Sequence, residues 1–199
     1  MKDLPVYKMS ISENDDNDIE VTYIALVDEP AIQKNFFAYK ETAQSFSIEN
    51  EDERIITGLA MVADLPIYRR DKDGEFYTVF DAQSIKQIAQ KFFRKQYNYK
   101  FNLSHDETEQ PDGIYIFESW IVDREKGKIP MEQFKDVSNG SWIISAKIDN
   151  DEVWQQIKSG EFKGFSVQGF FKMEREKIPA QMSMKEFDTE LLKLLQSSL

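Results

Sequence analysis

Cysteine is absent from this sequence of 199 residues, and histidine occurs only once, as His105. A chain without thiols forms no disulfide, no thiolate zinc site, no iron–sulfur cluster and no cysteine nucleophile. A zinc site built from two or more histidines is excluded as well. Any reaction that requires an imidazole base must therefore use His105.

Long hydrophobic runs are also missing. No stretch approaches the roughly 18 apolar residues that cross a bilayer, and the first ten residues lack a signal-peptide core, so we expect a cytosolic protein without a membrane partner. Hydrophobic residues make up 41% of the chain and aromatic residues 13%, which is enough for a packed core. The length fits one domain, with or without arms.

Basic residues are scarce in the first part of the chain. Residues 1–53 hold 13 acidic and 4 basic side chains, whereas the rest hold 23 and 21, which together give the formal net charge of -11. A nucleic-acid-binding protein needs a basic face, and neither part offers one. We therefore expect no nucleic-acid partner.

The N-terminal segment has the pattern of a hairpin. Residues 5–11 and 19–27 alternate apolar and polar side chains around an acidic stretch, and residues 42–53 are polar enough to form a linker. The sequence thus predicts an acidic hairpin arm and linker over residues 1–53.

A strand-rich body is predicted over residues 54–177. Apolar alternation and a turn at residues 72–74 predict a hairpin, and Asp81 is a good N-cap for a helix over residues 82–96. Further strands are expected at 100–104, 113–122, 141–148 and 162–173, with a short helix over 151–159 that ends at Gly160. An amphipathic helix is predicted within residues 178–199, where Ser183 and Glu186 form a capping box.

The order of these elements sets the fold class. Short strands far outnumber helices and do not alternate regularly with them, which argues against a doubly wound parallel sheet. We expect a β-rich α+β fold whose mostly antiparallel sheet closes into a small barrel with flanking helices.

Two segments have features that suit catalysis. His105 follows an apolar strand at Asn102–Leu103–Ser104–His105–Asp106, and a histidine at a strand end can face a cleft. Ser166 lies between Gly164 and Gly169, where an open backbone allows a carbonyl substrate to approach a nucleophilic hydroxyl. Taken singly, each also fits a plain alternative, namely an exposed loop histidine and a serine on the polar side of a strand.

Five short segments in order resemble one family. They are Ile56–Thr57–Gly58, residues 66–71, residues 102–106, Glu118–Ser119–Trp120 and residues 164–169. This set resembles the XkdF-like phage serine proteases, relatives of the prohead proteases whose fold is similar to that of herpesvirus assemblins, over about residues 1–175. The resemblance implies that His105 is the general base and Ser166 the nucleophile.

The identity of a third catalytic member stays open. Assemblins orient their base with a second histidine, which this chain lacks, so a carboxylate would have to serve. Glu118 is the first candidate, because the strand after the histidine loop could bring it beside the imidazole. Asp106 and Asp64 are further candidates, and Glu118 also fits an outward strand residue paired with a lysine.

By this resemblance, the chain would be a serine endopeptidase of prohead maturation that works without a cofactor or metal. Its substrates would be scaffold and major capsid protein precursors and itself, as a homo-oligomer inside assembling proheads in the host cytoplasm. The alternative is a structural prohead component with the same fold and no catalysis. A metal-dependent hydrolase using His105, Asp106, Glu107 and Glu109 is disfavoured, because consecutive acids do not point to one centre.

Overall fold

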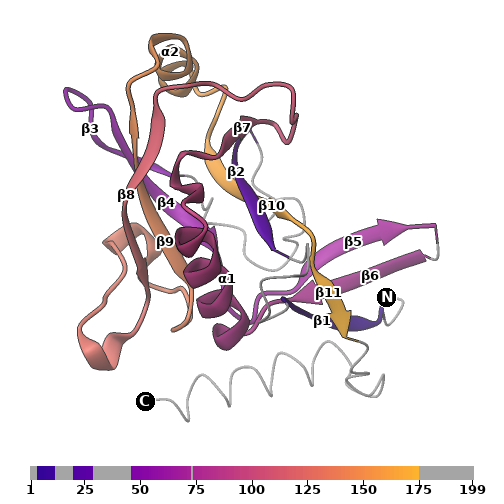
Figure 1. Cartoon of the computed structure of the whole chain (residues 1–199). Coiled ribbons are helices and arrows are strands. Elements are labelled where there is room, and N and C mark those ends of the chain that lie inside the picture. Colours follow the sequence, from indigo (N-terminus) through magenta and orange to yellow (C-terminus); the bar gives the residue numbers. More distant parts are fainter. Residues whose placement is uncertain (1–3, 12–19, 29–45, 73, 175–199) are drawn as a thin grey trace.

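The computed structural model describes residues 4–11, 20–28, 46–72 and 74–174, which form three β-sheets and two α-helices (Figure 1). The first sheet has the strand order β11 (Lys172–Glu174), β1 (Val6–Ser10), β6 (Gly74–Val79), β5 (Ile67–Asp71). The second has the order β10 (Gly164–Gly169), β2 (Val21–Val27), β7 (Phe101–Leu103). The third has the order β3 (Ser47–Asn50), β4 (Ile55–Met61), β9 (Trp142–Ile148), β8 (Ile114–Ile121).

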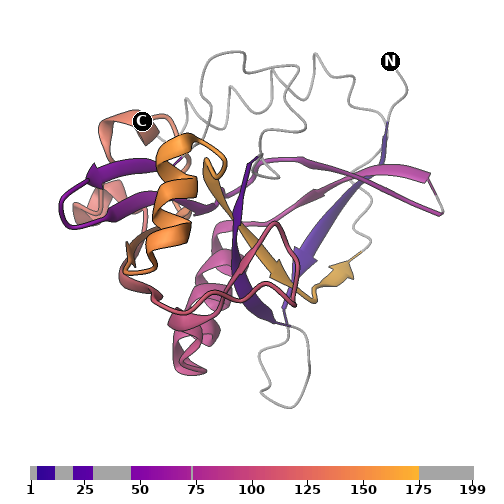
Figure 2. The ribbon, with the colours of Figure 1, turned by 90° about the horizontal axis from the view of Figure 1, so that it is seen from above.

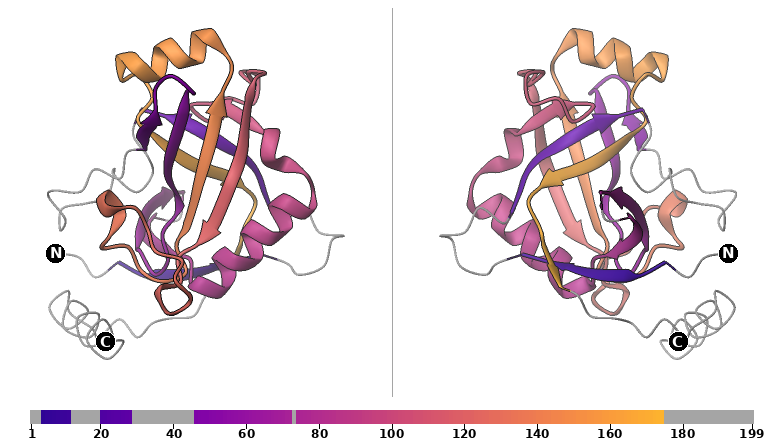
Figure 3. Two further views of the ribbon diagram at one scale, coloured as in Figure 1. Left: turned by 90° about the vertical axis from the view of Figure 1, so that its left-hand side faces the viewer. Right: turned by 90° about the vertical axis from the view of Figure 1, so that its right-hand side faces the viewer.

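The strands pair mostly in antiparallel fashion, as the sequence predicts. The exceptions among the described ladders are β1 with β6 and β2 with β7, which are parallel. The predicted closed barrel is wrong. Within the described residues, each of the three sheets is open, because its two edge strands pair with only one neighbour. Instead, the β2–β10 pair lies diagonally across the third sheet (Figure 3), and the β5–β6 hairpin projects to one side (Figure 2).

The predicted N-terminal hairpin is wrong. β1 pairs with β6 and β11, whereas β2 pairs with β7 and β10, so the two strands belong to different sheets. Ile24, Ala25 and Leu26 of β2 are fully buried, because this strand lies in the interior rather than in an arm. Residues 47–50, expected in a linker, form β3 beside β4.

Both predicted helices of the body are confirmed. α1 (Ala82–Arg94) begins after Asp81, whose carboxylate accepts a hydrogen bond from the Ser84 N–H at 2.7 Å. α2 (Asp151–Ser159) ends at Gly160, which has the left-handed φ of 77°. α1 packs Phe92 and its neighbour edge-on against the fully buried Trp142 of β9, and this contact attaches the helix to the third sheet.

The segment expected as one strand over 162–173 is divided between two sheets. β10 pairs with β2 and β11 pairs with β1, and the change occurs at an irregularity beside Gly169. A Cβ atom on Gly169 would lie 2.2 Å from the carbonyl oxygen of Glu20, and the N–H of Phe170 donates to that same oxygen at 2.9 Å. Only glycine allows so close a backbone crossing.

A buried ionic cluster holds the start of β2 against α1. The Glu20 carboxylate, only 6% exposed, lies 2.5 Å from Lys95 Nζ and 3.6 Å from Lys91 Nζ, and it accepts a hydrogen bond from Tyr97 at 3.0 Å. Burial by itself raises the pKa of Glu20, but the hydrogen bonds from Lys95 and Tyr97 and the two lysine charges lower it below its usual 4.5.

The residues predicted to form the C-terminal amphipathic helix, with the boundary at 177/178, lie outside the described part of the chain. Within the described residues, none of the helices has the length and apolar character that crossing a bilayer requires.

We predict that Glu20→Gln lowers the free energy of unfolding at neutral pH by about 2 kcal/mol, the usual worth of hydrogen bonds to a charged group. Because the folded protein lowers the pKa of Glu20, this contribution is present above pH 4.5 and is lost as the pH falls through the folded pKa. Urea unfolding at a series of pH values should therefore show a smaller gap between wild type and variant in acid. A gap that does not shrink would contradict the ionic role.

Gly169→Ala should destabilise the protein by about 1–3 kcal/mol, because the added methyl group collides with backbone rather than with a movable side chain. The measurement is the denaturant midpoint with an unchanged slope. An unaltered midpoint would contradict the close contact between Gly169 and the Glu20 backbone.

Candidate active site

The three-stranded sheet brings together the two segments that the sequence singled out. β2 is the middle strand, and its Ala25 pairs with Ser166 of β10 on one side and with Asn102 of β7 on the other. Residues directly opposite each other in a ladder project to the same face, so these three side chains form one row. Ala25, in the middle of this row, has only a methyl group, so no large side chain stands between Ser166 and β7.

The side chains of β10 alternate between the core and the opposite face of the sheet. Phe165 points into the core, and Val167 and Phe171 pack against that core, so Ser166 and Gln168 project to the opposite face. Gly58 of β4 permits this packing, since a Cβ there would lie 3.1 Å from the Phe165 ring and 2.8 Å from Phe46.

His105 reaches this row through a tight turn after β7. Ser104 and His105 both have left-handed backbone angles, with φ of 50° and 65°. Such angles cost of order 1 kcal/mol or more for a residue other than glycine, and they persist only where the surroundings hold them. Here the Ser104 N–H donates to the Leu26 carbonyl at 2.9 Å, and the Asp106 N–H donates to the Leu103 carbonyl at 2.8 Å.

The turn places the imidazole against the serine. His105 Nε2 and Ser166 Oγ are 3.1 Å apart, although 61 positions separate the residues in sequence. Ser166 is 6% exposed and His105 is exposed, so the pair lies where the interior meets the surface. With the ring proton on Nδ1, Nε2 accepts the hydroxyl hydrogen, which is the arrangement a general base requires.

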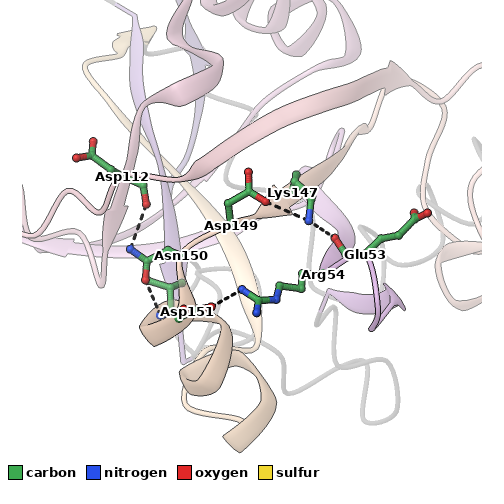
Figure 4. Close-up of polar contacts among 8 residues, drawn as sticks. Glu53, Arg54, Asp112, Lys147, Asp149, Asn150 and Asp151 are labelled. Atoms are coloured by element: carbon green, nitrogen blue, oxygen red, sulfur yellow. Dashed lines mark hydrogen bonds and ion pairs between the residues drawn. The ribbon is translucent and has the colours of Figure 1, made fainter.

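The loop after His105 is fixed at several points. The Leu103 N–H donates to the Glu109 carbonyl at 3.0 Å, and the N–H and hydroxyl of Thr108 both donate to the Asp106 carboxylate, which lowers the pKa of Asp106. At the far end of the loop, the Asn150 side chain donates to the Asp112 carbonyl at 3.1 Å (Figure 4).

The far end of the loop lies beside a group of ion pairs that joins the third sheet to α2 (Figure 4). Arg54 and Asp151 are 2.6 Å apart, and Lys147 is 3.1 Å from Asp149 while it also donates to the Glu53 carbonyl. These surface ion pairs contribute little stability singly. The loop itself is attached beside them by the Asn150 hydrogen bond to Asp112 and by the Asp149 N–H, which donates to the Gly113 carbonyl at 2.7 Å.

The three carboxylates considered as third member each make contacts of their own. Glu118 is exposed on β8 of the third sheet, where it accepts a hydrogen bond from Ser145 of β9 at 2.9 Å. Asp64 lies near the start of α1, because its N–H donates to the Phe80 carbonyl at 2.8 Å, and burial together with the charge of Asp81 raises its pKa. The Asp106 carboxylate is engaged by Thr108 of its own loop. The structure thus brings Ser166 and His105 together and leaves Glu118 in a separate hydrogen-bond network.

Two amide side chains beside the pair have no role assigned from the sequence. Asn102 donates to Gln168 at 2.6 Å, and Gln168 donates to Glu107 at 2.8 Å. Alternation places Gln168 on the face of Ser166, but only the pairing of β10, β2 and β7 reveals that Asn102 shares this face. Among the described residues, the site included, no group of three or more histidine, aspartate or glutamate side chains is arranged to hold a metal ion.

Comparisons with known proteins give one consistent result. A family model described as "Putative phage serine protease XkdF" matches residues 42–175. The "Phage-like element PBSX protein XkdF" of Bacillus subtilis (strain 168) is 26% identical over 159 residues, and the match covers 75% of this chain and 52% of that protein. The "Uncharacterized protein YqbD" of the same organism is 25% identical over 162 residues, and the match covers 75% of this chain and 44% of that protein. The chain therefore spans about half the length of these relatives, and no solved structure matches it.

The variant Glu118→Gln tests whether the Glu118 carboxylate acts on the pair of Ser166 and His105. Its amide oxygen can still accept from Ser145, so we expect little change in stability and an unchanged rate of Ser166 labelling by a fluorophosphonate. The rate is read from the mass of the intact protein over time. A large loss of labelling in a folded variant would show that Glu118 influences Ser166 despite its separate hydrogen-bond network.

Proposed function

This chain belongs to the family described as "Putative phage serine protease XkdF", and from that premise we propose that it is a serine endopeptidase with Ser166 as nucleophile and His105 as general base. The single observation that supports the assignment most is the 3.1 Å contact between Ser166 Oγ and His105 Nε2. Nucleophile and base in hydrogen-bond contact are the minimal requirement of acyl-enzyme catalysis.

The reaction would proceed in two halves. Ser166 Oγ bonds to the carbonyl carbon of the scissile peptide while its proton moves to His105 Nε2; the C–N bond then breaks as Nε2 gives that proton to the leaving amine. In the second half, water attacks the acyl ester and passes a proton to Nε2. That proton returns to Ser166 Oγ when the carboxylic acid product leaves. Each half requires the neutral imidazole at its start.

We assign the substrates by membership in the phage family. The proposed substrates are precursors of the scaffold and the major capsid protein, and the chain itself, which a homo-oligomer would cut within an assembling prohead in the host cytoplasm. The name of one relative as a phage-like element protein supports a phage setting.

A structural role without catalysis is the second candidate, and one observation favours it. Ser166 is only 6% exposed, which leaves little of this residue open to a substrate carbonyl. A prohead component that keeps the fold but does not cut would require no such access.

Chemical labelling separates the two candidates. We expect a fluorophosphonate to add one adduct to the wild type, located on Ser166 by peptide mapping, and to leave Ser166→Ala unlabelled. His105→Ala should lower the labelling rate by about a thousandfold or more, because members of such a group act as a unit.

The controls for this experiment are the far-ultraviolet circular dichroism and melting temperature of each variant, which should match the wild type. Labelling should also be unaffected by EDTA, whereas loss with EDTA and return with a divalent ion would favour a metal-dependent hydrolase. A folded wild type that takes up no adduct would support the structural role.

A further inference from the structure

We propose that Gln168 is a positioning residue that clamps the His105 segment onto the strand that carries Ser166. This inference rests on the proposed function, since it assigns Gln168 a part in holding the catalytic pair together. Gln168 acts through the backbone segments on which the two catalytic side chains are carried.

Gln168 is placed to join the two segments. It follows Ser166 by two positions in β10 and projects to the same face. Its Oε1 accepts a hydrogen bond from Asn102 Nδ2 at 2.6 Å, and its Nε2 donates to Glu107 Oε1 at 2.8 Å. Asn102 precedes His105 by three residues and Glu107 follows it by two, so one side chain grips the histidine segment on both sides.

The histidine segment needs such a restraint. Ser104 and His105 both occupy left-handed backbone angles, which a chain abandons when nothing holds it there. Backbone hydrogen bonds fix the turn to β2 and to itself. The two hydrogen bonds of Gln168 tie the segment to β10 as well, and a shift of about 1 Å between nucleophile and base can cost about a hundredfold in rate.

The orientation of the two amides follows from Glu107. A carboxylate only accepts, so the NH2 group of Gln168 faces Glu107 and its carbonyl faces Asn102. The Asn102 side chain is fully buried, and its Oδ1 has no hydrogen-bond partner among the described residues. A buried acceptor without a partner costs about 1–3 kcal/mol, so Asn102 is not explained by stability alone. Its donation to Gln168 is the contact that accounts for an amide at this position.

The test exchanges the polarity of the contact. In Gln168→Glu, two carboxylates face each other and the bond to Glu107 is lost. In the double variant Gln168→Glu/Glu107→Gln, the new carboxylate can accept from Asn102 and from the amide introduced at position 107, with the net charge of the wild type. The matched control is Gln156→Glu on α2, which carries neither Ser166 nor His105; there Gln156 donates to the Glu161 carboxylate at 3.2 Å in an exposed contact of the same amide–carboxylate type.

Fluorophosphonate labelling kinetics provide the first readout. We expect Gln168→Glu to lower the maximal labelling rate by about tenfold or more with an unchanged half-saturating concentration, because alignment fails while the probe still binds. The double variant should regain most of that rate, and Gln156→Glu should label like the wild type. An undiminished rate in Gln168→Glu, or a double variant no faster than it, would overturn the inference.

The second readout does not depend on activity. Because the chain has one histidine, the imidazole nitrogen signals in an NMR spectrum belong to His105 without further assignment. Gln168→Glu should shift them toward the averaged signals of an unrestrained imidazole, and the double variant should return them. If the wild type takes up no adduct, the proposed function fails, and these signals alone decide whether Gln168 positions His105; unchanged signals would refute it.

Discussion

The placement of β2 between β10 and β7 is the constraint on which the site depends. Ser166 lies in β10 and His105 follows β7, and these two strands do not pair with each other. Each strand pairs with β2, so β2 sets the position of both residues. The apolar residues of β2 are almost completely buried. Glu20, just before this strand, forms ion pairs with Lys91 of α1 and with Lys95, which follows the last turn of α1. Burial and charge thus fix the register, and the register fixes the pair.

The chemistry of the pair follows from its position at a boundary. A hydroxyl in the interior is shielded from water, whereas an imidazole at the surface can exchange protons with it. The turn that carries His105 is strained, and strained backbone persists where surrounding contacts are strong enough to hold it. The first and last parts of the following loop are both anchored, the latter by Asn150 beside α2.

Local patterns in the sequence predict much of this structure. The cap at Asp81, the helix end at Gly160 and the hairpin of β5 and β6 depend on neighbouring residues, and all three are predicted correctly. Ladder partners depend on the whole chain, so local pattern alone could not show that β1 and β2 belong to different sheets or that the barrel stays open. Glu118 illustrates the limit, because its cross-strand neighbour is Ser145 of β9 and not a residue of the histidine segment.

The pairing of β2 with β10 has a consequence for synthesis. Thr22 and Gln168, which are in contact, lie 146 positions apart, so this pairing closes one of the longest loops in the chain. At translation rates of about 5–20 residues per second, on the order of ten seconds pass between the synthesis of β2 and that of β10. During that interval the strand exposes an unpaired apolar edge to other nascent chains, which is a hazard for aggregation. Ser166 meets His105 only when that edge is covered, so the pair is assembled only after β10 has been synthesised.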